Sequence, residues 1–180
     1  MNIGSPIPPW RVPTFIKGTL TFSSLSHLST QPLVLCCTPS LTASQAWLLE
    51  SHINDFHIHH TFLATLVSRY MGYDVPWALP SSNFRLPLLT DPLKRVSRSL
   101  GLSRNLPPQR CETLFFGQNG RLAFRLIHDL DLRGIIRVLE ITNRHFSRSL
   151  PTPLDSTHPP ALKPSTFEEV EAHTATHVPT

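Results

Sequence analysis

Three cysteines and a group of histidines are the side chains of this 180-residue chain best suited to chemistry. A deprotonated cysteine is both a nucleophile and a metal ligand. Cys36, Cys37 and Cys111, two of them adjacent, cannot form a disulfide framework, which is consistent with a reducing compartment. The histidines of the run His57-Ile-His59-His60 could place two imidazoles on one face of a strand. A zinc site needs three or four ligands at set spacing, and no Cys-x-x-Cys or His-Glu-x-x-His accompanies them. We therefore expect a solvated turn there, with no metal and no cofactor.

The polar segment Pro39-Ser-Leu-Thr42-Ala-Ser-Gln45 lies between a predicted strand and a predicted helix. The apolar run from Leu33 to Cys37 is bounded by prolines and suits a central strand buried on both faces. From Ala43 to Phe56, apolar residues recur at three- and four-residue spacing, with Thr42 or Ser44 as N-cap. A second strand at Thr61–Val67 completes a β-α-β unit, and a right-handed crossover makes its two strands parallel.

Further elements flank this unit on both sides. Phe15–Phe22 predicts a hairpin around Gly18, and Asn119-Gly120 predicts a tight turn between strands at 113–117 and 121–127. The stretch from Met71 to Phe84 indicates a loop with a short helical turn near Trp77. Two helices are predicted as well. The first is capped by Asp91, has Pro92 at its first position and stops at Gly101. The second spans about Leu132–Phe146, and its inward residues are Ile135, Ile136, Leu139 and Phe146. The order of elements is that of a thioredoxin-like α/β fold, with a mixed central sheet flanked by helices.

Composition limits the class of protein. An apolar content of 40% predicts one core. No apolar run is long enough to span a membrane, and the N-terminus lacks the features of a signal peptide, so we expect a cytoplasmic protein. Prolines gather at both ends, which predicts extended arms and divides the chain into a domain at 1–150 and a C-terminal arm at 151–180.

The net charge of +4 comes mainly from arginines spread between Arg85 and Arg148. Such a surface could attract nucleic acid or another polyanion, and that binding would weaken steeply with salt. No nucleic-acid motif accompanies the charge, so we favour a solvated basic face.

Several segments, in order, resemble the typical two-cysteine peroxiredoxins, including the alkyl hydroperoxide reductase C group. The likeness extends from about Ile7 to Pro164. The segments are Phe84-Arg-Leu-Pro-Leu-Leu-Thr-Asp-Pro92, similar to F-P-L-L-S-D-P; Arg95-Val-Ser-Arg-Ser-Leu-Gly-Leu102, similar to a helix ending in Y-G-V; Arg110-Cys-Glu-Thr-Leu-Phe-Phe-Gly-Gln-Asn-Gly120, similar to R-x-T-F-I-I-D-x-x-G; His128-Asp-Leu-Asp-Leu-Arg133, similar to N-D-L-P-V-G-R; and Thr157-His-Pro-Pro-Ala-Leu-Lys-Pro164, similar to V-C-P-A-x-W-K-P.

The resemblance implies a thiol peroxidase site in which a Thr hydroxyl and an Arg guanidinium hold the attacking thiolate and the peroxide. The loop matches the family's Pro-x-x-x-Thr-x-x-Cys at Pro39 and Thr42, with one residue fewer between them, and Gln45 takes the place of the thiol. A gap placed elsewhere would put Ser44 or Ala46 there instead. An amide cannot attack a peroxide, so the catalytic cycle cannot start at this position.

The other family positions are altered as well. Arg110 is the nearest match to the family's pocket arginine, although a gapless count back from Gly120 puts Cys111 at that position. His158 occupies the position of the family's resolving cysteine. Cys36 and Cys37 match apolar strand residues that face opposite sides of the sheet, which favours core packing over catalysis. Cys111, beside an arginine, is the better candidate for a reactive thiol.

These features predict a peroxiredoxin-like pseudoenzyme of the antioxidant family that has lost thiol peroxidase activity. It would act as a non-catalytic binding or redox-associated partner protein, as a homodimer or in a hetero-oligomer with a related peroxiredoxin. A residual pocket at Pro39, Thr42, Gln45 and Arg110 would hold a small polar or anionic ligand. The alternative is a low-activity thiol-dependent peroxidase that uses Cys111 or Cys37.

Overall fold

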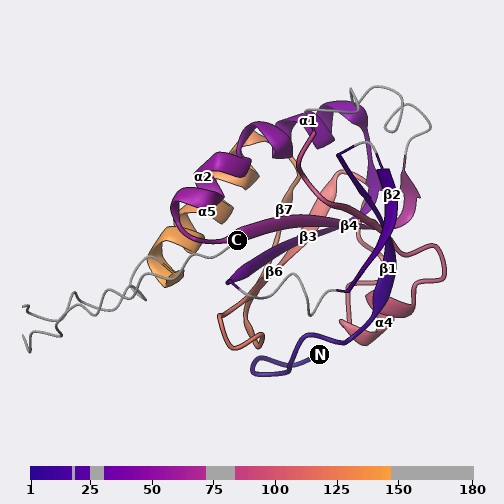
Figure 1. Cartoon of the computed structure of the whole chain (residues 1–180), viewed down its shortest axis with the longest axis horizontal. Coiled ribbons are helices and arrows are strands. Elements are labelled where there is room, and N and C mark those ends of the chain that lie inside the picture. Colours follow the sequence, from indigo (N-terminus) through magenta and orange to yellow (C-terminus); the bar gives the residue numbers. More distant parts are fainter. Residues whose placement is uncertain (18, 25–30, 72–83, 147–180) are drawn as a thin grey trace, which may run out of the picture. The chain divides into compact units, whose positions relative to one another are not determined.

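A mixed β-sheet forms the centre of the fold, with helices on both of its faces (Figure 1). The computed structural model describes residues 1–17, 19–24, 31–71 and 84–146, which all belong to one unit at 1–150. The predicted turn near Trp77, the proline-rich arm at 151–180 and His158 lie outside the described residues. Within the described part, seven strands form one sheet in the order β2-β1-β5-β4-β3-β6-β7. This is the predicted thioredoxin-like α/β class.

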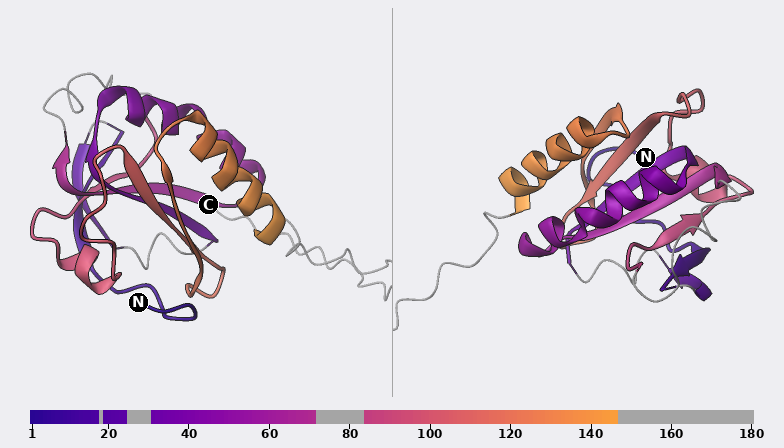
Figure 2. Two further views of the ribbon diagram at one scale, coloured as in Figure 1. Left: turned by 180° about the vertical axis from the view of Figure 1, so that it is seen from behind. Right: turned by 90° about the horizontal axis from the view of Figure 1, so that it is seen from above.

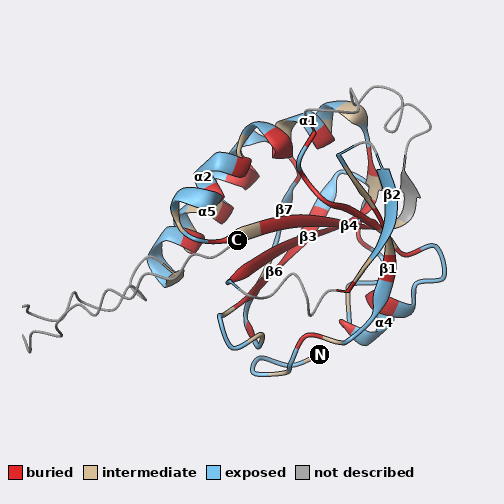
Figure 3. Ribbon diagram, viewed as in Figure 1, coloured by how far each residue is buried: buried red, intermediate tan, exposed pale blue. Residues whose placement is uncertain are grey.

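The middle of the sheet is built from the most apolar strands. β3 (Leu33–Leu41) pairs in parallel with β4 (Phe62–Met71) and antiparallel with β6 (Arg110–Phe116). Residues 33 to 37 are all buried, as predicted for a central strand, and Figure 3 shows the continuous burial of this region. Antiparallel β1 (Arg11–Ile16) and β2 (Thr19–Ser24) form the predicted first hairpin, and β1 joins the sheet through the short strand β5 (Leu88–Thr90).

The first predicted helix is divided into α1 (Ala43–Ser51) and α2 (Ile53–Ile58). The break occurs at His52, whose ring Nδ1 donates to the carbonyl of Leu48 at 2.9 Å, while Ser51 Oγ donates to the same oxygen at 2.8 Å. These side chains occupy the carbonyl that the His52 amide would use in a continuous α-helix, and the amide bonds Leu49 O instead. The predicted single helix is therefore wrong at this one position.

The helix on the opposite face also begins later than predicted. α4 spans Arg95–Ser99, because Lys94 adopts a left-handed backbone with φ of 53° that interrupts the helix predicted from Pro92. The N-cap is therefore Lys94, which makes no side-chain cap bond, and not the predicted Asp91. The buried carboxylate of Asp91 still accepts the backbone N–H of Ser97 in the helix at 2.7 Å. The chain leaves this helix at Gly101, as predicted.

The C-terminal elements follow the prediction closely. β6 and β7 (Leu122–Asp129) form a hairpin, and Gly120 in its turn has φ of 65°, a conformation that glycine adopts readily. The last helix, α5, has the predicted bounds Leu132–Phe146. Its inward stripe differs from the prediction at Ile136, which is exposed, because the buried positions follow Ile135, Val138 and Thr142 around the helix.

Two apolar layers hold the sheet between its helices. One contains Cys36 and Phe56 and packs beneath α1, α2 and α5, and the other contains Cys37 and Leu100 and packs beneath α4. Figure 2 shows α1, α2 and α5 together over one face of the sheet. The N-terminal segment runs along the β6–β7 turn, where Pro6 bridges to Arg121.

Candidate functional site

The loop after β3 ends in a capped helix N-terminus. Thr42 is the N-cap of α1, and its Oγ1 accepts the backbone N–H of Gln45 at 3.3 Å. In return, the Gln45 side-chain oxygen accepts the backbone N–H of Thr42 at 3.0 Å. This reciprocal pair is a capping box, which satisfies two amides that the first turn leaves without helical partners. Gln45, at the predicted thiol position, is thus engaged with the backbone of the loop.

Pro39 lies at an irregularity in β3. The register with β4 shifts between Thr38 and Ser40, where proline has no N–H to offer the ladder. The hydroxyl of Ser40 donates to the carbonyl of Pro108 at 3.3 Å, which ties this end of the strand to the segment before β6. β3 therefore continues beyond its predicted end at Cys37 and carries the loop to α1.

The Arg110 side chain points to β7. Its Nε lies 3.2 Å from Oδ1 of Asp129, the residue directly opposite on that strand, and both side chains are at least half exposed. Only the Arg110 carbonyl approaches β3, at 3.4 Å from Thr38 Oγ1. The structure thus pairs Thr42 with Gln45 and Arg110 with Asp129.

All three cysteines are free and buried, with at most 2% of each residue exposed. Cys36 and Cys111 lie in the layer beneath α1, α2 and α5, and Cys37 lies in the layer on the α4 side, so the adjacent pair faces opposite sides as predicted. Burial raises the pKa of Cys37 and of Cys111 well above the ordinary value of a thiol. Both side chains are therefore protonated thiols at neutral pH, shielded from solvent.

A buried polar group surrounds Cys36 and Cys111. Thr113 Oγ1 lies 3.5 Å from Cys36 Sγ, 3.6 Å from Cys111 Sγ and 2.8 Å from His128 Nε2. The pKa of Cys36 is lowered, first by its hydrogen bond with Cys111 and then, against desolvation by burial, by Thr113. Sequence reasoning did not connect these residues, although alternation along β6 puts Cys111 and Thr113 on one face.

The protonation state of His128 follows from its two contacts. Its Nδ1 lies 2.8 Å from the carbonyl of Asp129, which can only accept, so Nδ1 carries a proton. Burial lowers the pKa of His128, which keeps the ring neutral and leaves Nε2 as an acceptor for the Thr113 hydroxyl.

The histidine run lies at the end of α2 and in the turn after it. His57 and His60 are exposed, and His59 is half-buried. Among the described residues, no three His, Cys, Asp or Glu side chains are grouped closely enough to hold a metal ion. No helix in the same part of the chain is both long and apolar enough to cross a membrane.

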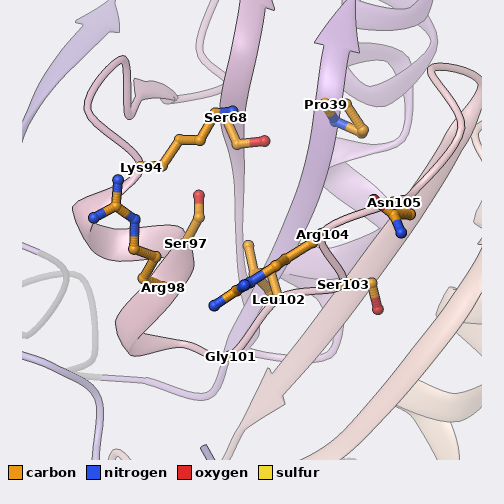
Figure 4. Close-up of a pocket in the computed structure, with 10 residues that line it drawn as sticks. All are labelled: Pro39, Ser68, Lys94, Ser97, Arg98, Gly101, Leu102, Ser103, Arg104 and Asn105. Atoms are coloured by element: carbon orange, nitrogen blue, oxygen red, sulfur yellow. The ribbon is translucent and has the colours of Figure 1, made fainter.

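A cavity of about 590 Å³ opens on the α4 side of the sheet, beside Pro39. Its lining comes from the ends of β3 and β4, from α4 and from the segment that follows α4 (Figure 4). Three basic side chains contribute to it, namely Lys94, Arg98 and Arg104. None of the three was singled out from the sequence, where they belong to a dispersed set of basic residues.

The fold is that of solved peroxiredoxins. Thioredoxin peroxidase I of Plasmodium yoelii has a TM-score of 0.65 at 16% identity, over 88% of this chain and 100% of that chain. The reduced 2-Cys peroxiredoxin of Plasmodium vivax has a TM-score of 0.62 at 16% identity, over 81% of this chain and 83% of that chain. AhpC of Mycobacterium tuberculosis has a TM-score of 0.63 at 13% identity, over 84% of this chain and 96% of that chain. No model of a protein family and no curated protein matches the sequence.

Proposed function

We propose that this chain is a peroxiredoxin-like protein without thiol peroxidase activity, which acts as a non-catalytic partner protein. The observation that carries the proposal is the side chain of Gln45. It stands where the family resemblance puts the attacking thiol, and it closes a capping box with Thr42 at 3.0 Å. A glutamine amide has no redox chemistry to offer at this position.

The remaining groups of the chain support the same conclusion. A peroxidase needs a solvent-accessible thiolate beside a hydroxyl and a guanidinium. All three cysteines are buried, the pKa values of Cys37 and Cys111 are raised, and the Arg110 guanidinium is paired with Asp129. His158 replaces the resolving cysteine in sequence. The family's catalytic residues are altered at several positions at once. This pattern favours a protein without peroxidase activity over one that uses another thiol for the same reaction.

The partner in this proposal is a second copy of the chain or a related peroxiredoxin that pairs along β7. β7 is the last strand in the order of the described sheet. Its first residue, Leu122, bonds Gly4 and Ser5 of the N-terminal segment, and beyond Leu122 its outer edge has no neighbouring strand among the described residues. Phe124 and Ile127 on this strand are 37% and 45% exposed. An edge strand with exposed apolar side chains is a template for pairing with another strand. Three free thiols support a cytoplasmic location for such a complex.

A peroxide-consumption assay tests the loss of activity. Hydrogen peroxide is supplied with thioredoxin and its reductase, or with dithiothreitol, and an active two-cysteine peroxiredoxin serves as the positive control. We expect the rate of the wild-type chain to equal that of a variant in which all three cysteines are alanine. Turnover that Cys111→Ala or Cys37→Ala abolishes would instead establish the low-activity peroxidase.

Light scattering coupled to size exclusion tests the partner surface. We expect a dimer that Ile127→Lys dissociates, because a charged side chain on an edge strand opposes pairing. The matched control is Leu93→Lys, which changes an exposed leucine away from β7. A monomeric wild-type chain that also fails to bind a related peroxiredoxin would refute this part of the proposal.

A further inference from the structure

The cavity on the α4 side lies where small molecules commonly bind in α/β proteins. Pro39 and Ser68 come from the carboxyl ends of the parallel strands β3 and β4, and α4 and residues 101–105 form its two walls (Figure 4). In open α/β sheets, the crevice beyond the carboxyl ends of parallel strands is the usual ligand site. A volume of about 590 Å³ is within the range of small-molecule pockets.

Two buried carboxylates hold the walls in place. Asp91 accepts both the backbone N–H and the hydroxyl of Ser97 at 2.7 Å, which anchors α4. Glu112 accepts the backbone N–H of Ser103 at 2.8 Å, and its partner Arg125 donates to the carbonyl of Gly101 at 2.8 Å, which anchors the opposite wall. The cavity is thus shaped before a ligand arrives, which reduces the entropy cost of binding.

The cavity carries a positive charge. Lys94, Arg98 and Arg104 line it, and no carboxylate is among its described lining residues. Figure 4 shows the Arg104 side chain extending from its wall toward α4. Glu112 is paired with Arg125, and the Asp91 carboxylate accepts from the neutral donors of Ser97. Lys94 and Arg98 on one wall and Arg104 on the other make the lining basic, which favours an anion.

The lining also distinguishes between kinds of anion. Guanidinium groups bind phosphate oxygens through paired hydrogen bonds, and the Ser68 hydroxyl and the Asn105 amide add neutral donors. Pro39 and Leu102 offer an apolar surface for an organic group. A phosphate monoester carries between one and a half and two negative charges at neutral pH, whereas a simple carboxylate carries one.

We propose that this cavity binds a small phosphate monoester. The site is separate from the Thr42–Gln45 capping box, and binding there requires no redox chemistry. The proposal therefore goes beyond the loss of peroxidase activity, and its test does not depend on whether that activity is lost.

Calorimetric titration of the full chain with phenyl phosphate at low salt tests this site. We expect saturable binding that Arg98→Ala and Lys94→Ala each weaken by about tenfold or more, because each removes a charged hydrogen-bond donor. The matched control is Arg95→Ala, which removes an exposed arginine from the same helix but outside the lining. We expect this variant to bind as the wild type does, and benzoate to bind at least about tenfold more weakly than phenyl phosphate.

A second measurement uses only the wild-type chain. In amide chemical-shift mapping with phenyl phosphate, the proposal predicts perturbations concentrated at residues 94–105 and at Ser68. Perturbations spread over the basic surface, or equal weakening by Arg95→Ala, would reduce the effect to general charge attraction and overturn the proposal. The absence of binding at about 10 mM phenyl phosphate would overturn it as well.

Discussion

Replacing Arg125 with methionine should destabilise the fold by about 3 kcal/mol, because the change leaves a buried carboxylate without its counter-ion. Arg125 on β7 donates to Glu112 on β6 through Nε at 2.9 Å and also through Nη2. It also donates to the carbonyls of Gly101 and Met1, at 2.8 and 3.1 Å. Methionine fills a similar volume and makes none of these bonds.

The magnitude follows from the exposure of the two partners. Only 4% of the Glu112 side chain is exposed, so its charge depends on protein donors, and after the substitution Ser103 N alone remains. Removal of one member of a buried pair costs about 3 to 5 kcal/mol. The Arg125 side chain is 27% exposed, so water can replace part of its contribution, which favours the lower end of this range.

Equilibrium urea unfolding, followed by far-ultraviolet circular dichroism, measures the change in the free energy of unfolding. The double variant Glu112→Gln/Arg125→Met removes both charges and should recover at least half of the loss. Arg133→Met, at an exposed position of α5, should change stability by no more than about 0.5 kcal/mol. A loss below about 1 kcal/mol for Arg125→Met, or a double variant as unstable as the single one, would refute the reasoning.

Four further outcomes are expected. Thr42→Ala should cost about 1 kcal/mol of unfolding free energy in urea titrations, and Ser44→Ala clearly less, because only Thr42 is the N-cap; equal losses would contradict this. Iodoacetamide should label all three cysteines after unfolding but none in the native protein, and native labelling of Cys111 would show that burial does not protect it. The pKa of His128 is lowered in the folded protein, so the unfolded chain protonates this histidine more readily, and stability should fall as the pH drops below about 6.5. The urea midpoints measured at about pH 7.5 and 5.5 should therefore differ less in His128→Gln than in the wild type. Gly134→Ala should destabilise by about 2 kcal/mol despite the better helix propensity of alanine, because the added methyl would overlap the backbone of the turn before α5, and a more stable variant in thermal unfolding would refute this.

Local patterns allowed most of the elements to be predicted. The Asn119-Gly120 turn and the bounds of α5 depend on residues close together in sequence, and both were predicted correctly. The capping box is also visible in the sequence, because Thr42-Ala-Ser-Gln45 has the required spacing, although the sequence leaves the N-cap open between Thr42 and Ser44. The break at His52 was not predictable, since it depends on which donor forms a hydrogen bond with the carbonyl of Leu48.

The environment of the cysteines needed the tertiary structure. The sequence puts Cys111 beside Arg110, which favoured a reactive thiol. Strand alternation turns the two side chains to opposite faces, and strand pairing places His128 opposite Cys111. The thiol is therefore enclosed in the core, while the arginine meets Asp129 at the surface.

The sequence by itself determined the fold class and the absence of a cysteine at position 45, because hydrophobic periodicity, turn residues and residue identity are properties of the chain alone. Only the tertiary structure decided which side chains meet. Lys94, Arg98 and Arg104 line one cavity because buried Asp91 and Glu112 hold two separate segments over the ends of β3 and β4. Contacts of this kind depend on register and packing between distant segments, which local propensity does not encode.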